Sequence, residues 1–82
     1  MKTVQISLNS IGKVKSFVNT ISQFEYDFDL ISGRYVIDAK SIMGIFSLDL
    51  SKPIDLAIHT EDNLNEILEA LKPYRKQSDS YR

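Results

Sequence analysis

Four segments of the chain alternate polar and apolar residues with a period of two, which is typical of strands that bury one face. The first covers residues 2–8, and the second covers residues 26–30, with Asp27 and Asp29 on its polar side. The third covers residues 34–38, and the fourth begins after Pro53. Ser32 and Gly33 lie between the second and third, where glycine allows a tight turn. We therefore expect a sheet that packs on one face and meets solvent on the other.

Apolar residues between these segments follow a helical spacing instead. Positions i, i+3, i+4 and i+7 are apolar in residues 14–21 and again in residues 64–71, so each helix presents one apolar stripe. Ser10 precedes the first helix and is expected to cap it. Residues 41–48 predict a short middle helix, capped by Ser41. The last helix is expected to have acidic residues at its start and basic residues at its end, as the helix dipole favours: Glu61, Asp62, Lys72, Arg75 and Lys76.

The order β-α-β-β-α-β-α predicts an α+β open-faced β-sandwich, a four-stranded antiparallel sheet with three helices on one face. A length of 82 residues predicts one domain, 1–82, with a frayed tail from about residue 76. The chain has 10 basic and 11 acidic residues, so its net charge of −1 argues against binding to nucleic acid. No apolar stretch is long enough to span a membrane. Because there is no cysteine, thiol chemistry and the usual structural zinc sites are excluded.

The sequence from Val36 to Leu48, VIDAKSIMGIFSL, resembles the regulatory-serine region of the HPr family. HPr is the histidine-containing phosphocarrier of the bacterial phosphoenolpyruvate-dependent sugar phosphotransferase system, which transports sugars into the cell. We expect this chain to be a cytoplasmic protein. The resemblance implies the family's fold and implies that an ATP-dependent HPr-type kinase phosphorylates Ser41. It also implies a partner-binding surface made by Lys40, Ile42, Met43 and Phe46. From the residues alone, Ser41 could be a plain helix cap and the apolar residues could belong to the core.

The family's second signature, a histidine followed by arginine and proline at the start of the first helix, is not found in this chain. An alignment without gaps places these three positions at Ser10, Gly12 and Lys13. Ser10, Lys13 and Lys15 could form an anion pocket at the helix start, or the two lysines could be tolerated in solvent despite the dipole. A serine ester is a poor phosphoryl donor, because an alkoxide is a much worse leaving group than a neutral imidazole.

The single histidine, His59, is predicted on the outer face of the fourth strand, solvated, with Asp55 two residues before it. No paired carboxylates, catalytic triad or glycine-rich phosphate loop can be assembled, and we expect no metal site and no cofactor. The leading hypothesis is a regulatory protein-binding module controlled at Ser41, because relatives that lack the histidine act in carbon catabolite control. Its expected partners are proteins: the kinase, a transcriptional regulator or phosphotransferase components. The alternatives are an atypical phosphocarrier that uses Ser10 or His59, and an interaction module without phosphorylation.

Overall fold

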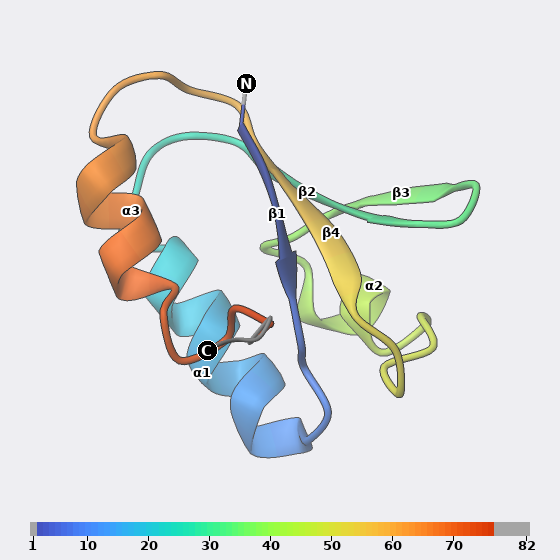
Figure 1. Ribbon diagram of the computed structural model, residues 1–82. Helices are drawn as coiled ribbons and strands as arrows, with labels where there is room; N and C mark the ends of the chain where they lie inside the picture. The colour runs from blue at the N-terminus through green and yellow to red at the C-terminus, as the bar shows by residue number, and fades with distance from the viewer. Residues whose placement is uncertain (1, 77–82) are drawn as a thin grey trace, which may run out of the picture.

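The computed structural model describes residues 2–76. Its strands and helices follow the expected order: β1 (Lys2–Ile6), α1 (Ile11–Ile21), β2 (Phe28–Ser32), β3 (Tyr35–Asp38), α2 (Ile42–Ile45), β4 (Ile54–Ile58) and α3 (Leu64–Ala70) (Figure 1). The β-α-β-β-α-β-α prediction is therefore confirmed.

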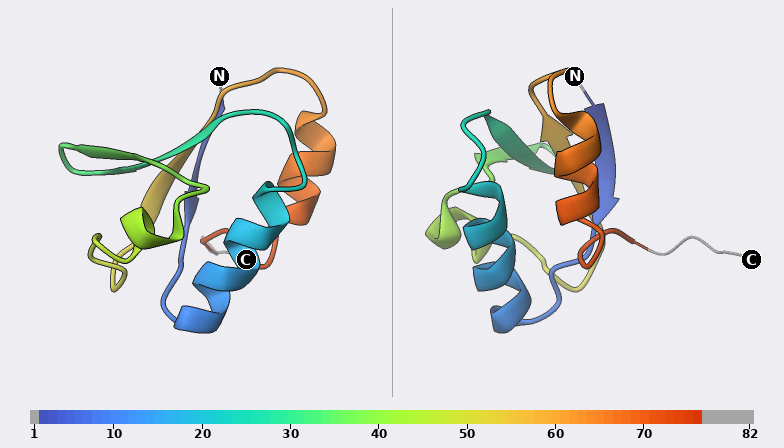
Figure 2. Two further views of the ribbon diagram at one scale, coloured as in Figure 1. Left: turned by 180° about the vertical axis from the view of Figure 1, so that it is seen from behind. Right: turned by 90° about the vertical axis from the view of Figure 1, so that its left-hand side faces the viewer.

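The strands form one sheet in the order β1-β4-β2-β3, and every neighbouring pair is antiparallel. Only β2 and β3 are joined by a hairpin; the other neighbours are brought together by longer connections. The helices lie on one face of the sheet, and the β2–β3 hairpin extends beyond the rest of it (Figures 1 and 2). This is the predicted four-stranded open-faced α+β sandwich.

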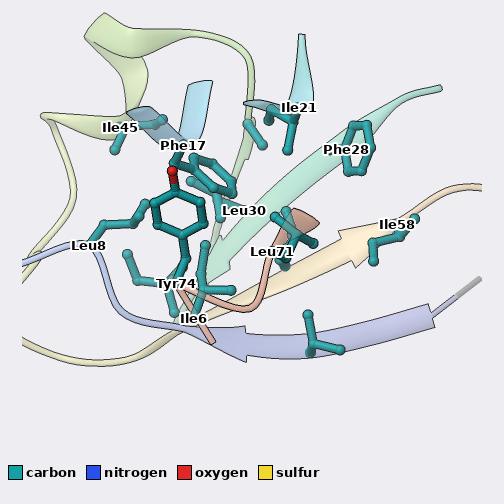
Figure 3. Packing of buried hydrophobic residues seen from close by; sticks show 14 of the residues in the cluster. Ile6, Leu8, Phe17, Ile21, Phe28, Leu30, Ile45, Ile58, Leu71 and Tyr74 are labelled. Atoms are coloured by element: carbon teal, nitrogen blue, oxygen red, sulfur yellow. The ribbon is translucent and has the colours of Figure 1, made fainter. Parts of the chain in front are cut away.

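The core lies between the sheet and the helices (Figure 3). Sheet residues such as Leu30 and Leu56 and helix residues such as Phe17 and Ile21 are all 0% exposed. Burying each such side chain contributes about 1.5–3 kcal/mol. Within residues 2–76 no polar or charged side chain is buried, so apolar packing dominates the interior.

Several boundaries differ from the expectation. β1 ends at Ile6 instead of Leu8, although Leu8 remains fully buried. β2 begins at Phe28, and Tyr26, which was expected to point inward from the strand, is half-buried in the preceding loop. The alternation of β4 predicts Leu56 and Ile58 on the buried face and Ala57 on the solvated face, but Ala57 is only 1% exposed. It lies on the central strand β4, opposite Thr3 of β1 and Asp29 of β2, whose longer side chains flank its single methyl group.

The ends of α3 also differ. Asn63 precedes the helix with φ of 56°, a left-handed conformation that asparagine tolerates better than most residues. The basic residues expected in the last turn follow Ala70 instead, so the predicted match to the dipole is wrong there. Lys72 pairs with Glu69 at 3.2 Å on the surface.

After α3 the chain returns to the free edge of β1. The Ser7 N–H donates to the Tyr74 carbonyl at 2.7 Å, and the Lys76 N–H donates to the Gln5 carbonyl at 3.0 Å. The Tyr74 ring packs edge-on against Phe17, with centroids 5.7 Å apart. Lys76, the first residue of the predicted tail, is thus paired with β1. Residues 77–82 of that tail lie outside the described residues.

Candidate functional site

Ser41 lies on the surface between β3 and α2. Its backbone is extended, with φ of −93° and ψ of 102°, and its Oγ accepts the Gly44 N–H at 3.2 Å. This confirms the predicted N-cap. A Cβ atom at Gly44 would approach Ser41 Oγ to 3.2 Å and Ile37 Cδ1 to 3.4 Å, tighter than most such contacts. Glycine therefore lets α2 pack closely on β3 while the serine caps it.

Lys40 is half-buried, and its ammonium group is used inside the fold. Its Nζ donates to the Phe24 carbonyl at 2.8 Å, beyond the end of α1, and lies 5.6 Å from the centroid of the Phe28 ring. Carbonyl and ring both attract a cation. Lys40 was predicted to bind a partner. In the structure these contacts hold the segment before Ser41 against the end of α1.

Asp38, the last residue of β3, also fixes the turn before Ser41. Asp38 Oδ1 accepts the Lys40 N–H at 2.9 Å, and the Asp38 carbonyl accepts the Ser41 N–H at 3.0 Å. Ala39 is fully buried and bonds through its N–H to the Phe28 carbonyl at 2.9 Å. Ser41 is thus an exposed hydroxyl on a well-anchored turn.

The predicted apolar surface is divided between the core and solvent. Helix α2 has four residues, shorter than the expected 41–48, and it buries Ile45 completely. Ile42 is half-buried against the core, whereas Met43 is 78% exposed and Phe46 is 42% exposed. The exposed apolar surface beside Ser41 consists of Met43 and Phe46, which we call the α2 patch.

The α2 patch continues toward the start of α1. A shallow groove of about 550 Å³ lies between them and is lined by Asn9, Ser10, Ile11, Phe46, Leu50 and Ser51. Ile11 is 64% exposed. The hydrophobic pattern does not predict this exposure, because Ile11 stands three residues before Val14 and fits the apolar stripe of the helix.

Ser10 is an exposed N-cap of α1, and its Oγ accepts the Lys13 N–H at 3.1 Å. The cap prediction is confirmed. Lys13 and Lys15 are both exposed on α1. Neither lysine is among the described residues that line the groove beside Ser10. An anion pocket formed by these residues stays a prediction.

His59 is exposed at the other end of the sheet. It follows Ile58, which pairs with Lys2 at the start of β1, whereas Ser10 follows the end of β1. Its Nε2 lies 2.8 Å from Asp29 Oδ2 on β2, so its nearest carboxylate comes from the adjacent strand instead of Asp55. In residues 2–76 no group of three or more His, Asp or Glu side chains is arranged to hold a metal ion.

The loop that follows α2 contains one shifted carboxyl group. Asp49 Oδ1 accepts the Ser51 hydroxyl at 2.6 Å and the Ser51 N–H at 3.1 Å. These hydrogen bonds stabilise the charged form and lower the pKa of Asp49, with a smaller contribution from the charge of Lys52. The hydrogen bonds of Asp49 therefore hold the loop in place beside the groove.

Fold and site together define a small open-faced α+β sandwich with a serine-capped apolar helix on its surface. Residues 13–76 match the family described as the PTS HPr component phosphorylation site. HPr-C-His from Thermoanaerobacter tengcongensis is similar in structure: it is 31% identical, the match covers 87% of this chain and 86% of that one, and the TM-score is 0.71. The phosphocarrier protein HPr from Bacillus anthracis str. Ames is 32% identical, with 92% and 94% covered and a TM-score of 0.67.

No curated protein matches the chain. The family match spans most of the sequence and includes Ser41, and the chain belongs to the HPr family of the phosphotransferase system. Proteins of this family interact with other proteins of that system. Within residues 2–76, no helix combines the length and the apolar character that crossing a bilayer requires.

Proposed function

We propose that this HPr-family chain is a protein-binding module controlled by phosphorylation of Ser41, and that it does not carry phosphate on a histidine. The observation that carries the proposal is the placement of an exposed Ser41 at the cap of α2, next to the exposed α2 patch. The resemblance of the Lys-Ser-Ile-Met-Gly sequence to the family's regulatory site supports the same assignment.

Phosphorylation there would change the surface that a partner meets. A phosphoserine adds a charge of about −1.5 to −2 at neutral pH. The first turn of α2 contains no acidic residue, so the added charge would not meet a carboxylate within that turn. Met43 and Phe46 would then lie beside a dianion instead of a neutral hydroxyl. A partner with a basic residue next to its apolar contact would gain affinity, and a purely apolar or acidic partner would lose it.

The imidazole of this chain is placed poorly for the carrier role. His59 contacts Asp29 at the end of the sheet opposite Ser10, and the position that aligns with the family's histidine is a capping serine. A transferable phosphoryl group needs a good leaving group, which serine does not provide. These observations favour the regulatory role over the carrier.

Incubation with an HPr-type kinase and ATP tests the proposal. Intact-mass measurement should show one added phosphoryl group in the wild type and none in Ser41→Ala. Ser47→Ala is the matched control, since Ser47 lies just after α2, is also exposed, and donates its hydroxyl to the Gly44 carbonyl at 2.5 Å. Equal phosphorylation of Ser41→Ala and the wild type, or no phosphorylation of either, would contradict the proposal.

A further inference from the structure

The two edges of the sheet differ in what covers them. The β1 edge is partly paired, because Arg75 forms a bridge with Ile6 and Lys76 donates to Gln5. β3 is the other edge, and its hairpin extends away from the rest of the sheet (Figures 1 and 2). An extended edge strand with no covering segment is a template for pairing with another strand.

The exposed edge carries large apolar side chains. Tyr35 is 65% exposed and Val36 is 61% exposed, on opposite faces of the same strand. β3 is short, and Asp38 is its charged residue, but residues 35–38 contain none of the stronger protecting devices: no proline, no lysine and no bulge. β3 therefore offers β-branched and aromatic side chains to a neighbour, as strand pairing favours.

The backbone of Val36 faces outward. Ser32 and Tyr35 close a two-residue turn in which Gly33 has φ of 62°, so Tyr35 is in a hydrogen-bonded pair with Ser32. Hydrogen-bonded and non-bonded pairs alternate along an antiparallel ladder. Val36 is consequently in a non-bonded pair with Ile31, and its N–H and C=O point away from β2 toward the open edge.

Residues 34–38 carry complementary side chains when two copies of this segment run antiparallel, because one end is basic and the other is acidic. We propose that β3 pairs antiparallel with β3 of a second copy of this chain, about a two-fold axis at Val36. In this register Val36 faces Val36 of the second copy, Tyr35 faces Ile37, and Arg34 faces Asp38. The two Val36 residues exchange backbone hydrogen bonds, which is the pairing that their outward-facing groups require.

Both kinds of side-chain pair in this register are favourable. An aromatic residue opposite a β-branched one and a cation opposite an anion each stabilise a cross-strand pair. The two-fold axis makes each contact occur twice. Charge complementarity thus selects a second copy over a strand of unrelated sequence. The interface uses neither Ser41 nor the α2 patch, so it is independent of the proposed function.

Sedimentation equilibrium of the full chain, from micromolar to millimolar concentration, tests the pairing. The wild type should show a monomer–dimer equilibrium. Val36→Pro removes an N–H that faces the open edge and should weaken dimerisation by about tenfold or more. Val36→Thr keeps the N–H and the β-branched shape, and it should dimerise like the wild type.

A charge exchange identifies the register. Arg34→Asp and Asp38→Arg should each dimerise about fivefold or more weakly alone, since each homodimer faces like charges. An equimolar mixture should dimerise more tightly than either variant alone, because the heterodimer restores both opposite-charge pairs. Circular dichroism confirms that the variants are folded. A wild type that stays monomeric throughout, or a dimer that is insensitive to Val36→Pro and to both charge variants, would overturn the proposal.

Discussion

Replacing Met43 by glutamate tests whether the α2 patch belongs to the surface. Met43 is 78% exposed, so the change removes little buried area. Glutamate is a good helix former, and a carboxylate near a helix N-terminus is tolerated or favourable. Surface changes of this kind alter the free energy of unfolding by less than about 0.5 kcal/mol. For a chain of 82 residues this corresponds to a change in melting temperature of less than about 4 °C.

Ile45→Ala is the matched control, because Ile45 lies two residues further along the same helix and is 0% exposed. Truncating a buried isoleucine costs about 2–5 kcal/mol, which lowers the melting temperature by about 8 °C or more. Thermal unfolding followed by circular dichroism measures both variants. If Met43→Glu is destabilised as much as Ile45→Ala, then Met43 belongs to the core and the account of the α2 patch is wrong.

Three further predictions concern individual side-chain contacts of Tyr74, Lys40 and Asp49. Tyr74→Phe loses the hydroxyl contacts with α1 and should lower the free energy of unfolding by about 1 kcal/mol in denaturant titration, whereas an unchanged midpoint would contradict these contacts. Lys40→Met removes the hydrogen bond to the Phe24 carbonyl and should cost about 1 kcal/mol, with Lys40→Arg losing less. The carboxyl of Asp49 should titrate below its ordinary pKa by NMR, and Ser51→Ala should raise that pKa; a midpoint unaffected by the variant would refute the hydrogen bonds.

The sign of the Asp49 effect on stability follows from the direction of its shift. A carboxyl group whose pKa is lower in the folded state stabilises the fold above its unfolded pKa, and this contribution is lost as the pH falls through the folded value. Because the pKa of Asp49 is lowered from an already acidic value, this loss of stability occurs only in the acid range. The loss is small, because Asp49 is fully exposed and solvent screens its charge.

The element types were predictable because each segment has a clear hydrophobic period. Leu30 and Leu56 follow the strand alternation, and Phe17 follows the helical stripe; all three are buried as the period requires. The caps at Ser10 and Ser41 were predictable for a local reason as well, since a serine before an apolar helix satisfies free N–H groups.

The remaining features depend on contacts between distant parts of the chain. Nothing in the local pattern places β4 between β1 and β2, and this order is what covers Ala57. Lys40 reaches the carbonyl of Phe24 only because the turn before α2 lies against the end of α1. The exposure of Ile11 likewise depends on where α1 begins relative to the loop around Leu50.

The chemical form of the phosphate tests the regulatory account most directly. One sample receives phosphoenolpyruvate and the general first enzyme of the phosphotransferase system, and another receives HPr-type kinase and ATP. The intact mass of each product is measured both before and after treatment with acid. We predict no phosphate from the first route, and from the second an acid-stable phosphate that is absent in Ser41→Ala. An acid-labile phosphate acquired from the phosphoenolpyruvate route would instead show a working phosphocarrier and contradict the account.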